Sequence, residues 1–186
     1  MNKNRVLVLS SGGIDSTACI KFYKNQKSRV YSLFIDFGQL SKTKELKASQ
    51  KIAKYYKIPY SLIKIKNNIQ YGSGLLIGRN AFLLTTALIN FKHDTGIIAV
   101  GVHSGTSYSD CSENFIHEMQ AVFDIYALGC IRVGAPFLNW SKADIYNFSK
   151  KEKIPLELTY SCELGKKQPC GKCNSCKDLE KLYALS

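Results

Sequence analysis

The sequence has no apolar run as long as a membrane span, and its first residues lead into an apolar segment without the layout of a signal peptide. It also has no internal repeat and no low-complexity tract. We therefore expect a soluble, cytoplasmic protein without a membrane partner. The 186 residues, of which 45% are hydrophobic, suffice for one globular domain with a sizeable core and are too few for two full domains.

Arginine is scarce in a chain that is otherwise strongly basic. The net charge is +12, but only four of the 26 basic residues are arginines, at Arg5, Arg29, Arg79 and Arg132. Arginine is the usual residue for bidentate contacts to phosphates and bases, whereas lysines dispersed along helices are mostly solvated surface. The charge therefore favours an ordinary basic surface, and nucleic-acid binding is the alternative.

The lysine of a Walker A site is absent, although a glycine loop is present. An apolar strand at 6–9 ends at residues 10–17, SSGGIDST, and a helical pattern follows. Paired glycines let the backbone approach a ligand, and the amides that begin the helix face the same point as the positive end of its dipole. We expect an anion here, most simply a phosphate chain. The alternative is an ordinary turn with Asp15 or Ser16 as the N-cap of the helix.

Strand and helix patterns alternate along the chain. Further strands are expected at 29–37, 60–65, 96–102 and 129–133, with helical patterns between them. Right-handed crossovers then give an α/β fold with a doubly wound, mainly parallel five-stranded sheet of the Rossmann type. Ligand-binding groups belong at the carboxyl ends of such strands. This places Asp36 and Gln39, and the polar loop 103–113, near the glycine loop.

Helix boundaries add three expectations. Arg79 follows an irregular segment at 67–78 and opens a helix, where a cation faces the positive dipole end unless an anion is bound. Ser141 and Asp144 have the spacing of a capping box at the start of a later helix. The apolar positions of the helical pattern at 115–126, Tyr126 included, are expected in the core.

Four of the seven cysteines cluster with the spacing C-x7-C-x2-C-x2-C, at Cys162, Cys170, Cys173 and Cys176. In a chain without a secretion signal, this pattern favours metal binding over disulfides. Tetrahedral zinc takes four soft ligands at about 2.3 Å, and two-residue spacers let neighbouring cysteines reach one ion. We predict a structural zinc site, with an iron–sulfur cluster or metal-free thiols as alternatives. The remaining cysteines are expected to be small buried residues, at Cys19, Cys111 and Cys130.

Six motifs occur in a fixed order: SSGGIDST, IDFGQ, GRN at 78–80, DC at 110–111, SKADI and SC-x7-CGKCNSC. In order and spacing they resemble the 7-cyano-7-deazaguanine synthase (QueC) family of the PP-loop ATP pyrophosphatases. The resemblance implies an adenine-nucleotide α-hydrolase-like fold. We expect a nucleotide-binding domain at 1–154 and a zinc-binding tail at 155–186, packed on the same domain.

The resemblance also implies an ATP-dependent, AMP-forming ligase. It would adenylate 7-carboxy-7-deazaguanine, join it to ammonia and dehydrate the amide to the nitrile, with ATP as co-substrate, Mg²⁺, structural Zn²⁺ and a homodimeric state. The implied ATP-binding residues are Ser10, Ser11, Gly12, Gly13, Asp15, Ser16, Thr17, Asp36, Gln39, Arg79 and Asn80. The implied catalytic residues are Asp15, Ser16, Arg79 and Lys142. The implied substrate-binding residues are His103, Tyr108 and Asp110.

The chain departs from the family pattern in its substrate-facing loops. The segment 67–78 is shorter than the lid of relatives, residues 103–109 read HSGTSYS in place of an acidic DYSG-type segment, and the tail reads SCEL where relatives often have SCY. The glycine loop is unchanged. Three alternatives therefore stay open: a ligase that joins the activated acid to another amine, such as a protein acceptor, a PP-loop enzyme that modifies tRNA, and a zinc-dependent adaptor without enzymatic activity.

Overall fold

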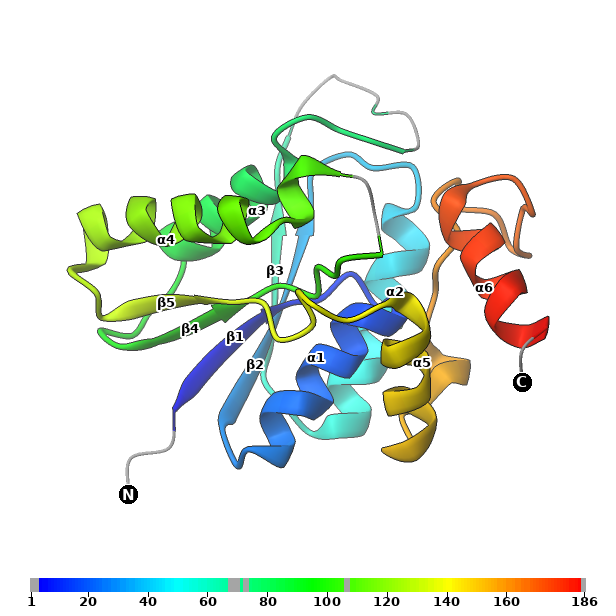
Figure 1. Cartoon of the computed structure of the whole chain (residues 1–186), viewed down its shortest axis with the longest axis horizontal. Helices are drawn as coiled ribbons and strands as arrows, with labels where there is room; N and C mark the ends of the chain where they lie inside the picture. The colour runs from blue at the N-terminus through cyan, green and yellow to red at the C-terminus, as the bar shows by residue number, and fades with distance from the viewer. Residues whose placement is uncertain (1–3, 67–70, 72–73, 106–107, 185–186) are drawn as a thin grey trace.

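Over residues 4–66, 71, 74–105 and 108–184, which this computed structural model describes, five parallel strands form one sheet in the order β3-β2-β1-β4-β5 (Figure 1). The strands are β1 (Arg5–Leu9), β2 (Arg29–Asp36), β3 (Tyr60–Lys64), β4 (Gly96–Ala99) and β5 (Ile131–Gly134). The sheet grows outward from β1 in both directions, because β1 pairs in parallel with β2 and with β4. The predicted α/β fold with a doubly wound parallel sheet is confirmed.

Helices cover both faces of this sheet. They are α1 (Ile14–Asn25), α2 (Lys42–Tyr56), α3 (Arg79–Ile89), α4 (Glu113–Ala127), α5 (Lys142–Lys151) and α6 (Asn174–Ala184), with short 3-10 helices at Ser109–Cys111 and Leu156–Leu158. Alternate side chains of β1 point to opposite faces. Val6 and Val8 join a core cluster with α1, α2 and α5, whereas Leu7 and Leu9 join a second cluster with α3 and α4.

The starts of α1 and α5 differ in how they are capped. At α5 the Ser141 hydroxyl accepts from the Asp144 backbone N–H at 3.2 Å, and the Asp144 carboxylate accepts from the Ser141 N–H at 2.8 Å, which confirms the capping box. At α1 the N-cap is Gly13, in extended backbone, and no side chain caps the helix. The alternative that Asp15 or Ser16 is the N-cap is therefore wrong, and the first amides of α1 are left for another acceptor.

Two side chains are more exposed than their sequence pattern predicts. Cys19 is fully buried as expected, but Cys130 is exposed and Tyr126 is 74% exposed. Both lie at the turn from α4 into β5, where Leu128 and Gly129 have left-handed backbone conformations. The chain reverses direction there at the surface. For this reason the apolar pattern of α4 does not predict which side chains of its last turn are buried.

The tail that follows α5 returns to the glycine loop. The Tyr160 backbone N–H donates to the Gly12 carbonyl at 2.9 Å, and Leu179 of α6 packs against the core cluster that contains α1. Figure 1 shows the tail and α6, coloured orange to red, beside α5 and α2. The last part of the sequence therefore lies against the first.

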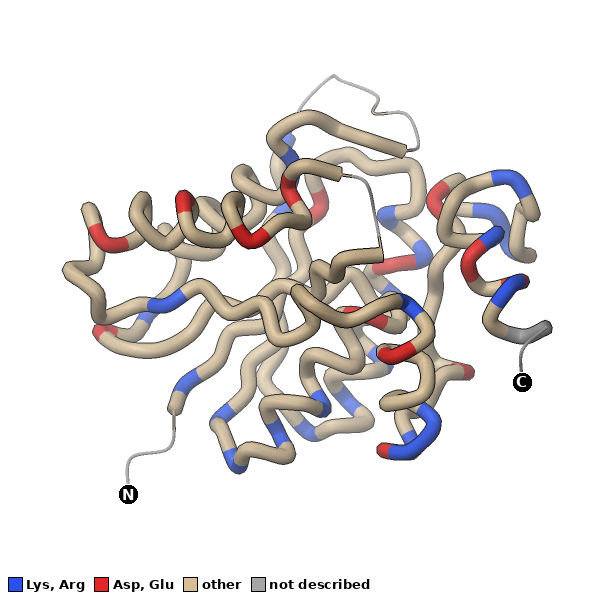
Figure 2. The backbone as a smooth tube through the Cα atoms, viewed as in Figure 1, with Lys and Arg blue, Asp and Glu red and all other residues tan. Residues whose placement is uncertain are grey.

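Basic residues are spread over several elements. Figure 2 shows lysines and arginines on α1, α2, α5 and the tail, whereas α4 carries acidic residues. The sequence of α4 contains Glu113, Glu118 and Asp124 and neither lysine nor arginine. In the described part of the chain, none of the helices has the length and hydropathy needed to cross a membrane.

Gly12 and Gly13 give a first prediction, because their surroundings differ. Gly12 has φ +78°, and a Cβ built on it would lie 2.7 Å from both the Ala48 Cβ and the Ser49 backbone nitrogen. The nearest atom to a Cβ on Gly13 is the Ser11 hydroxyl oxygen at 3.4 Å. Gly12→Ala should therefore lower the free energy of unfolding by about 2–4 kcal/mol.

Gly13→Ala is the matched control and should change that free energy by less than about 1 kcal/mol. Urea denaturation of both variants measures the difference. Equal costs for the two substitutions would contradict the close approach of Gly12 to α2.

Candidate functional site

A cavity of about 520 Å³ lies at the carboxyl ends of β1, β2 and β4. Most of the residues that the sequence assigns to a ligand site line it: Ser10, Ser11, Gly13, Asp15, Ser16, Gln39, Arg79, Asn80, His103, Tyr108 and Lys142. Four others are adjacent but outside the lining, namely Gly12, Thr17, Asp36 and Asp110. Within the loops 67–78 and 103–113, which the sequence assigns to substrate choice, residues 67–70, 72–73 and 106–107 lie outside the described part of the chain.

The glycine loop is held by hydrogen bonds to the carbonyl of Gly13. The Thr17 hydroxyl donates to this oxygen at 2.7 Å and the Ser16 hydroxyl at 3.1 Å. Thr17 is fully buried, so its hydroxyl shapes the loop rather than facing the cavity. Ser11 and Gly13 remain in the lining, where uncapped amides of α1 and the helix dipole favour an anion.

Asp15 and Lys142 form an ion pair inside the cavity. The Lys142 Nζ donates to the Asp15 carboxylate oxygens at 2.6 and 2.5 Å, and both side chains are about a quarter exposed. The two residues are far apart in sequence and come from the first turns of α1 and α5. The pair places one carboxylate and one ammonium group beside the glycine loop.

His103 is buried next to this pair. Its Nδ1 accepts a hydrogen bond from the Gly105 backbone N–H at 3.0 Å, so a neutral imidazole carries its proton on Nε2. Burial lowers the pKa of His103 and Lys142 lowers it further, whereas Asp15 and Asp178 act in the opposite direction. At neutral pH His103 is therefore an uncharged hydrogen-bond donor.

Asn80 links the GRN and DC motifs. Its side chain is buried and its Nδ2 donates to the Asp110 carbonyl at 3.2 Å, next to the half-buried Cys111. Arg79, one residue earlier, lines the cavity at the start of α3. The neighbouring Tyr108 accepts at its hydroxyl from Asn174 of α6 at 3.2 Å. Asn80 therefore holds the loop 108–111 beside Arg79.

Glu45 is a cavity residue that the sequence reading missed. Its carboxylate accepts from the Ser41 hydroxyl at 2.8 Å and from the Gln39 Nε2 at 3.0 Å. Burial raises the pKa of Glu45, and these two donors oppose the shift. The only signal in the sequence is an acid in the first turn of a lysine-rich helix, which is also common on a solvated helix. Asp36 instead accepts from the Gly38 N–H at 3.1 Å, within its own turn.

The tail supplies a further wall of the cavity, which the sequence reading also missed. It contributes Tyr160, Ser161, Glu163, Asn174, Ser175, Asp178 and Leu179. Nothing in the pattern of this segment distinguishes these positions from a surface tail, because their role depends on contacts with residues far earlier in the chain, such as Gly12, Gly74 and Tyr108.

The four clustered cysteines meet at one point. Their sulfur atoms all lie within 4.8 Å of one another, and Cys170 and Cys176 are 3.9 Å apart. Ligands of a single tetrahedral ion at about 2.3 Å stand about 3.8 Å apart, whereas a four-iron cluster holds its thiolates farther from each other. The group could therefore bind a metal ion.

Backbone donors prepare part of this group for metal binding. The N–H groups of Cys173 and Lys172 donate to the Cys170 sulfur and lower the pKa of Cys170 to about 6. Burial raises the pKa of Cys162, but backbone donors outweigh it and the resulting pKa is lowered. Burial raises the pKa of Cys176 to about 12, so its proton must leave when a metal binds.

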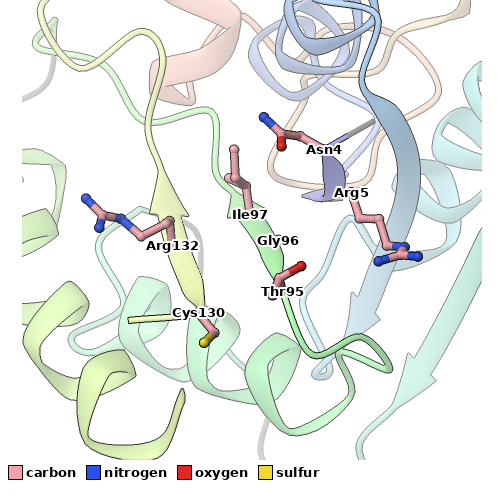
Figure 3. Close-up of a pocket in the computed structure, with 7 residues that line it drawn as sticks. All are labelled: Asn4, Arg5, Thr95, Gly96, Ile97, Cys130 and Arg132. Carbon is pink, nitrogen blue, oxygen red and sulfur yellow. The ribbon is translucent and has the colours of Figure 1, made fainter. Parts of the chain in front are cut away.

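A smaller cavity of about 270 Å³ lies at the amino ends of the strands, away from these residues. Figure 3 shows that the guanidinium groups of Arg5 and Arg132 point away from one another on either side of Gly96. The other lining residues are Asn4, Thr95, Ile97 and Cys130. This cavity brings no set of convergent polar groups together, so we assign no site to it.

The family model described as Queuosine biosynthesis protein QueC matches residues 5–78 and 72–185. A 7-cyano-7-deazaguanine synthase of Prochlorococcus marinus (strain MIT 9215) is 30% identical over 94% of this chain and 92% of its own. The 7-cyano-7-deazaguanine synthase 1 of Desulfitobacterium hafniense (strain Y51) is 30% identical over 100% of this chain and 94% of its own. The similarity thus extends over nearly the whole sequence.

Two solved structures share the fold. The U34-tRNA thiolase NcsA from Methanococcus maripaludis with its [4Fe-4S] cluster has a TM-score of 0.61 at 16% identity, over 100% of this chain and 66% of that one. A predicted subunit of tRNA methyltransferase from Methanocaldococcus jannaschii DSM has a TM-score of 0.56 at 16% identity, over 80% of this chain and 76% of that one. At such low identity the likeness concerns the fold alone.

The half-buried carboxyl of Glu45 gives a prediction about pH. Because burial raises its pKa in the folded state, its contribution to stability is present at low pH and is lost as pH rises through that pKa. Glu45→Gln does not titrate, so its stability relative to the unchanged protein should rise between pH 4 and pH 8.

Urea denaturation at pH 4, 6 and 8 measures this trend, with Glu157→Gln as a control at an exposed position. The control should show no such trend. A constant difference between Glu45→Gln and the unchanged protein over this range would be inconsistent with a raised pKa of Glu45 in the folded state.

Proposed function

Because the chain belongs to the QueC family of queuosine biosynthesis proteins, we propose that it converts 7-carboxy-7-deazaguanine and ammonia into 7-cyano-7-deazaguanine at the expense of ATP. Family membership makes it an enzyme of the 7-cyano-7-deazaguanine synthase type, an ATP-dependent carbon–nitrogen ligase. One observation carries the proposal for the site: the glycine loop, the Asp15–Lys142 pair and Arg79 converge on one cavity.

The proposed reaction has two activation steps. A carboxylate oxygen of the substrate attacks the α-phosphorus of ATP and pyrophosphate leaves. Ammonia then attacks the carbonyl carbon, AMP leaves and a proton is released, which gives the amide. The amide oxygen then attacks the α-phosphorus of a second ATP and pyrophosphate leaves, and loss of AMP and two protons gives the nitrile. Because AMP is a better leaving group than oxide, the main task of the protein is to align the reactants and to balance charge.

The phosphates of ATP would lie at the glycine loop and at the start of α1, in the cavity that Arg79 also lines. The Ser10 hydroxyl supports this assignment. It lines the cavity, is buried and has no hydrogen-bond partner among the described residues. A buried hydroxyl without a partner is costly, and a ligand oxygen would satisfy it.

Asp15 is the residue that we assign to Mg²⁺, since carboxylate and hydroxyl oxygens suit this ion. Mg²⁺ neutralises phosphate charge in such sites. In the structure Lys142 balances the charge of Asp15. On binding of the nucleotide, Lys142 is free to turn to the phosphates or to the negative charge that develops at the α-phosphate. His103, Tyr108 and Asp110 stay assigned to the substrate end of the cavity.

For the cysteine group we propose zinc. Four thiols with separations close to those of a single tetrahedral ion leave no ligand position open for water, so the role of the ion is structural. We also propose residue 154 as the boundary of the nucleotide-binding domain, because Ile154 is the last residue of the main core cluster before the tail. The homodimer stays a prediction.

A second candidate function keeps the adenylation and changes the amine. It is favoured by the sequence HSGTSYS at 103–109, which lacks the carboxylate of the family pattern beside the substrate end of the cavity. In that case the activated acid is joined to a larger amine, such as one on a protein acceptor. Modification of tRNA is the least favoured candidate, because its support is the basic charge and a fold-level likeness.

Incubation with ATP, Mg²⁺, ammonia and 7-carboxy-7-deazaguanine should give AMP, pyrophosphate and a product with the mass of the nitrile. Asp15→Ala should lower the rate of AMP formation at least about 100-fold, because it removes the carboxylate beside the phosphates. Asp94→Ala, at an exposed position, is the control and should leave the rate unchanged. Liquid chromatography with mass spectrometry follows all products.

Absence of AMP with the unchanged protein would refute the proposal. AMP formation without transfer to ammonia, together with a deazaguanine mass increment on a co-expressed protein, would select the second candidate. Equal rates in the two aspartate variants would reject the assignment of Asp15.

Metal analysis of the purified protein should find about one zinc per chain. Cys173→Ser should lose the metal and lower the melting temperature, since the site loses a buried ligand. Cys130→Ser, which changes an exposed cysteine outside the group, should retain it. Inductively coupled plasma mass spectrometry gives the metal content, and iron with acid-labile sulfide in place of zinc would overturn this assignment.

A further inference from the structure

Glu163 lies between the cysteine group and the cavity. It follows the buried Cys162 and lines the cavity. Its Oε2 accepts from the backbone N–H of Gly74 at 3.1 Å. Its Oε1 accepts from the backbone N–H of Ser175 at 3.1 Å and from the Ser175 hydroxyl at 2.9 Å. One carboxylate thus joins two segments that are about a hundred residues apart.

The first segment leads directly to Arg79. It begins at Gly74, and the Arg79 N–H donates to the Leu76 carbonyl at 3.1 Å, so residues 76–79 move together. Apolar burial does little to hold the segment, because Leu75 is 58% exposed and Ile77 is 91% exposed. Its position therefore depends on polar contacts, and the bond from Gly74 connects it to the tail.

The second segment belongs to the cysteine group. Ser175 lies on α6 between the buried Cys173 and Cys176. A bound metal ion would fix Cys162, Cys173 and Cys176 relative to one another, and with them both Glu163 and Ser175. Without the ion, the contacts of Glu163 with α6 among the described residues are its hydrogen bonds with Ser175, so the carboxylate is held less firmly.

Arg79 and Glu163 also interact electrostatically with a common neighbour, Glu45. Both Arg79 and Glu163 act on Glu45: the cation lowers the pKa of Glu45 and the second carboxylate raises it. All three side chains line the cavity. Hydrogen bonds to an ionised carboxylate are stronger than those between neutral groups, which suits Glu163 to a holding role.

We propose that Glu163 is a positioning residue that couples the cysteine group to Arg79, so that a metal-loaded tail holds the segment 74–79 in place. The inference rests on the metal site and the ATP site proposed above. It does not depend on the identity of the acid or of the amine.

Hydrogen exchange measured by mass spectrometry on the metal-loaded full chain tests the coupling. Glu163→Gln replaces one of the two acceptor oxygens with an NH2 group that cannot accept and removes the charge of the carboxylate, so the rate of exchange at residues 74–79 should rise about tenfold at unchanged metal content. Removal of metal from the unchanged protein by a chelator should produce the same rise. The chelator should add little to Glu163→Gln, because the coupling is already broken.

Glu180→Gln is the matched control, since it removes the same charge from an exposed position of α6. It should exchange like the unchanged protein. The KM for ATP should rise about tenfold in Glu163→Gln with kcat changed less than twofold, in line with loss of a binding position for Arg79. A change in kcat alone in Glu163→Gln, or equal KM values in Glu163→Gln and Glu180→Gln, would contradict the proposed effect of Glu163 on ATP binding by Arg79.

Unchanged exchange at 74–79 in Glu163→Gln, or an equal effect of the chelator in both proteins, would overturn the proposal. Should Glu163→Gln lose its metal, Ser175→Ala decides at full metal content: it removes one donor to Glu163 and should raise exchange in the same segment by a smaller factor. No rise in Ser175→Ala overturns the coupling. A wild-type chain that does not use ATP refutes the proposed function alone, and the exchange results still decide the role of Glu163.

Discussion

The close approach of the Gly12 backbone to α2 is the contact on which the rest of the site depends. It is possible because residue 12 has no Cβ and adopts a left-handed conformation. On one side the loop then rests against Ala48 and Ser49, and on the other its carbonyl accepts the N–H of Tyr160. The start of α1, the middle of α2 and the tail therefore meet at one loop, and residues of α3 and α5 complete the lining of the cavity.

The cavity contains several acidic side chains, although the chain as a whole is strongly basic. The protein has a net charge of +12, yet the cavity gathers the carboxylates of Asp15, Glu45 and Glu163. Lys142 and Arg79 stand among them. Ionised groups in a half-buried site interact more strongly than surface pairs, so opposite charges in fixed positions can exchange partners when a phosphorylated ligand arrives.

The sheet, the glycine loop and the cysteine group were predictable from the sequence because their signals are local. Apolar runs, paired glycines and two-residue cysteine spacers all act over a few positions. The parallel, doubly wound character of the sheet followed from the handedness of crossovers, and the capping box at Ser141 followed from spacing alone. For Asp15 and Lys142, the sequence predicted only that both residues belong to one site. It did not predict that they form an ion pair.

The wall formed by the tail was not predictable, because it arises from contacts between segments that are far apart in the chain. In the sequence, Glu45 and Glu163 look like surface acids. The packing of α2 and of the tail places both side chains in the lining of the cavity. The exposure of Cys130 and Tyr126 was missed for the opposite reason. A periodic pattern indicates which face of a helix is apolar, and it does not indicate where the turn at its end leaves the core.

The bond between Tyr160 and Gly12 also has a consequence for synthesis on the ribosome. The glycine loop is synthesised well before the segment that closes over it, and β4, which pairs with β1, also follows the loop in the chain. A nascent chain can form β1, α1 and β2 early, but the cavity is complete only after the tail has been synthesised. A product that ends before the tail would have the loop without the complete pocket.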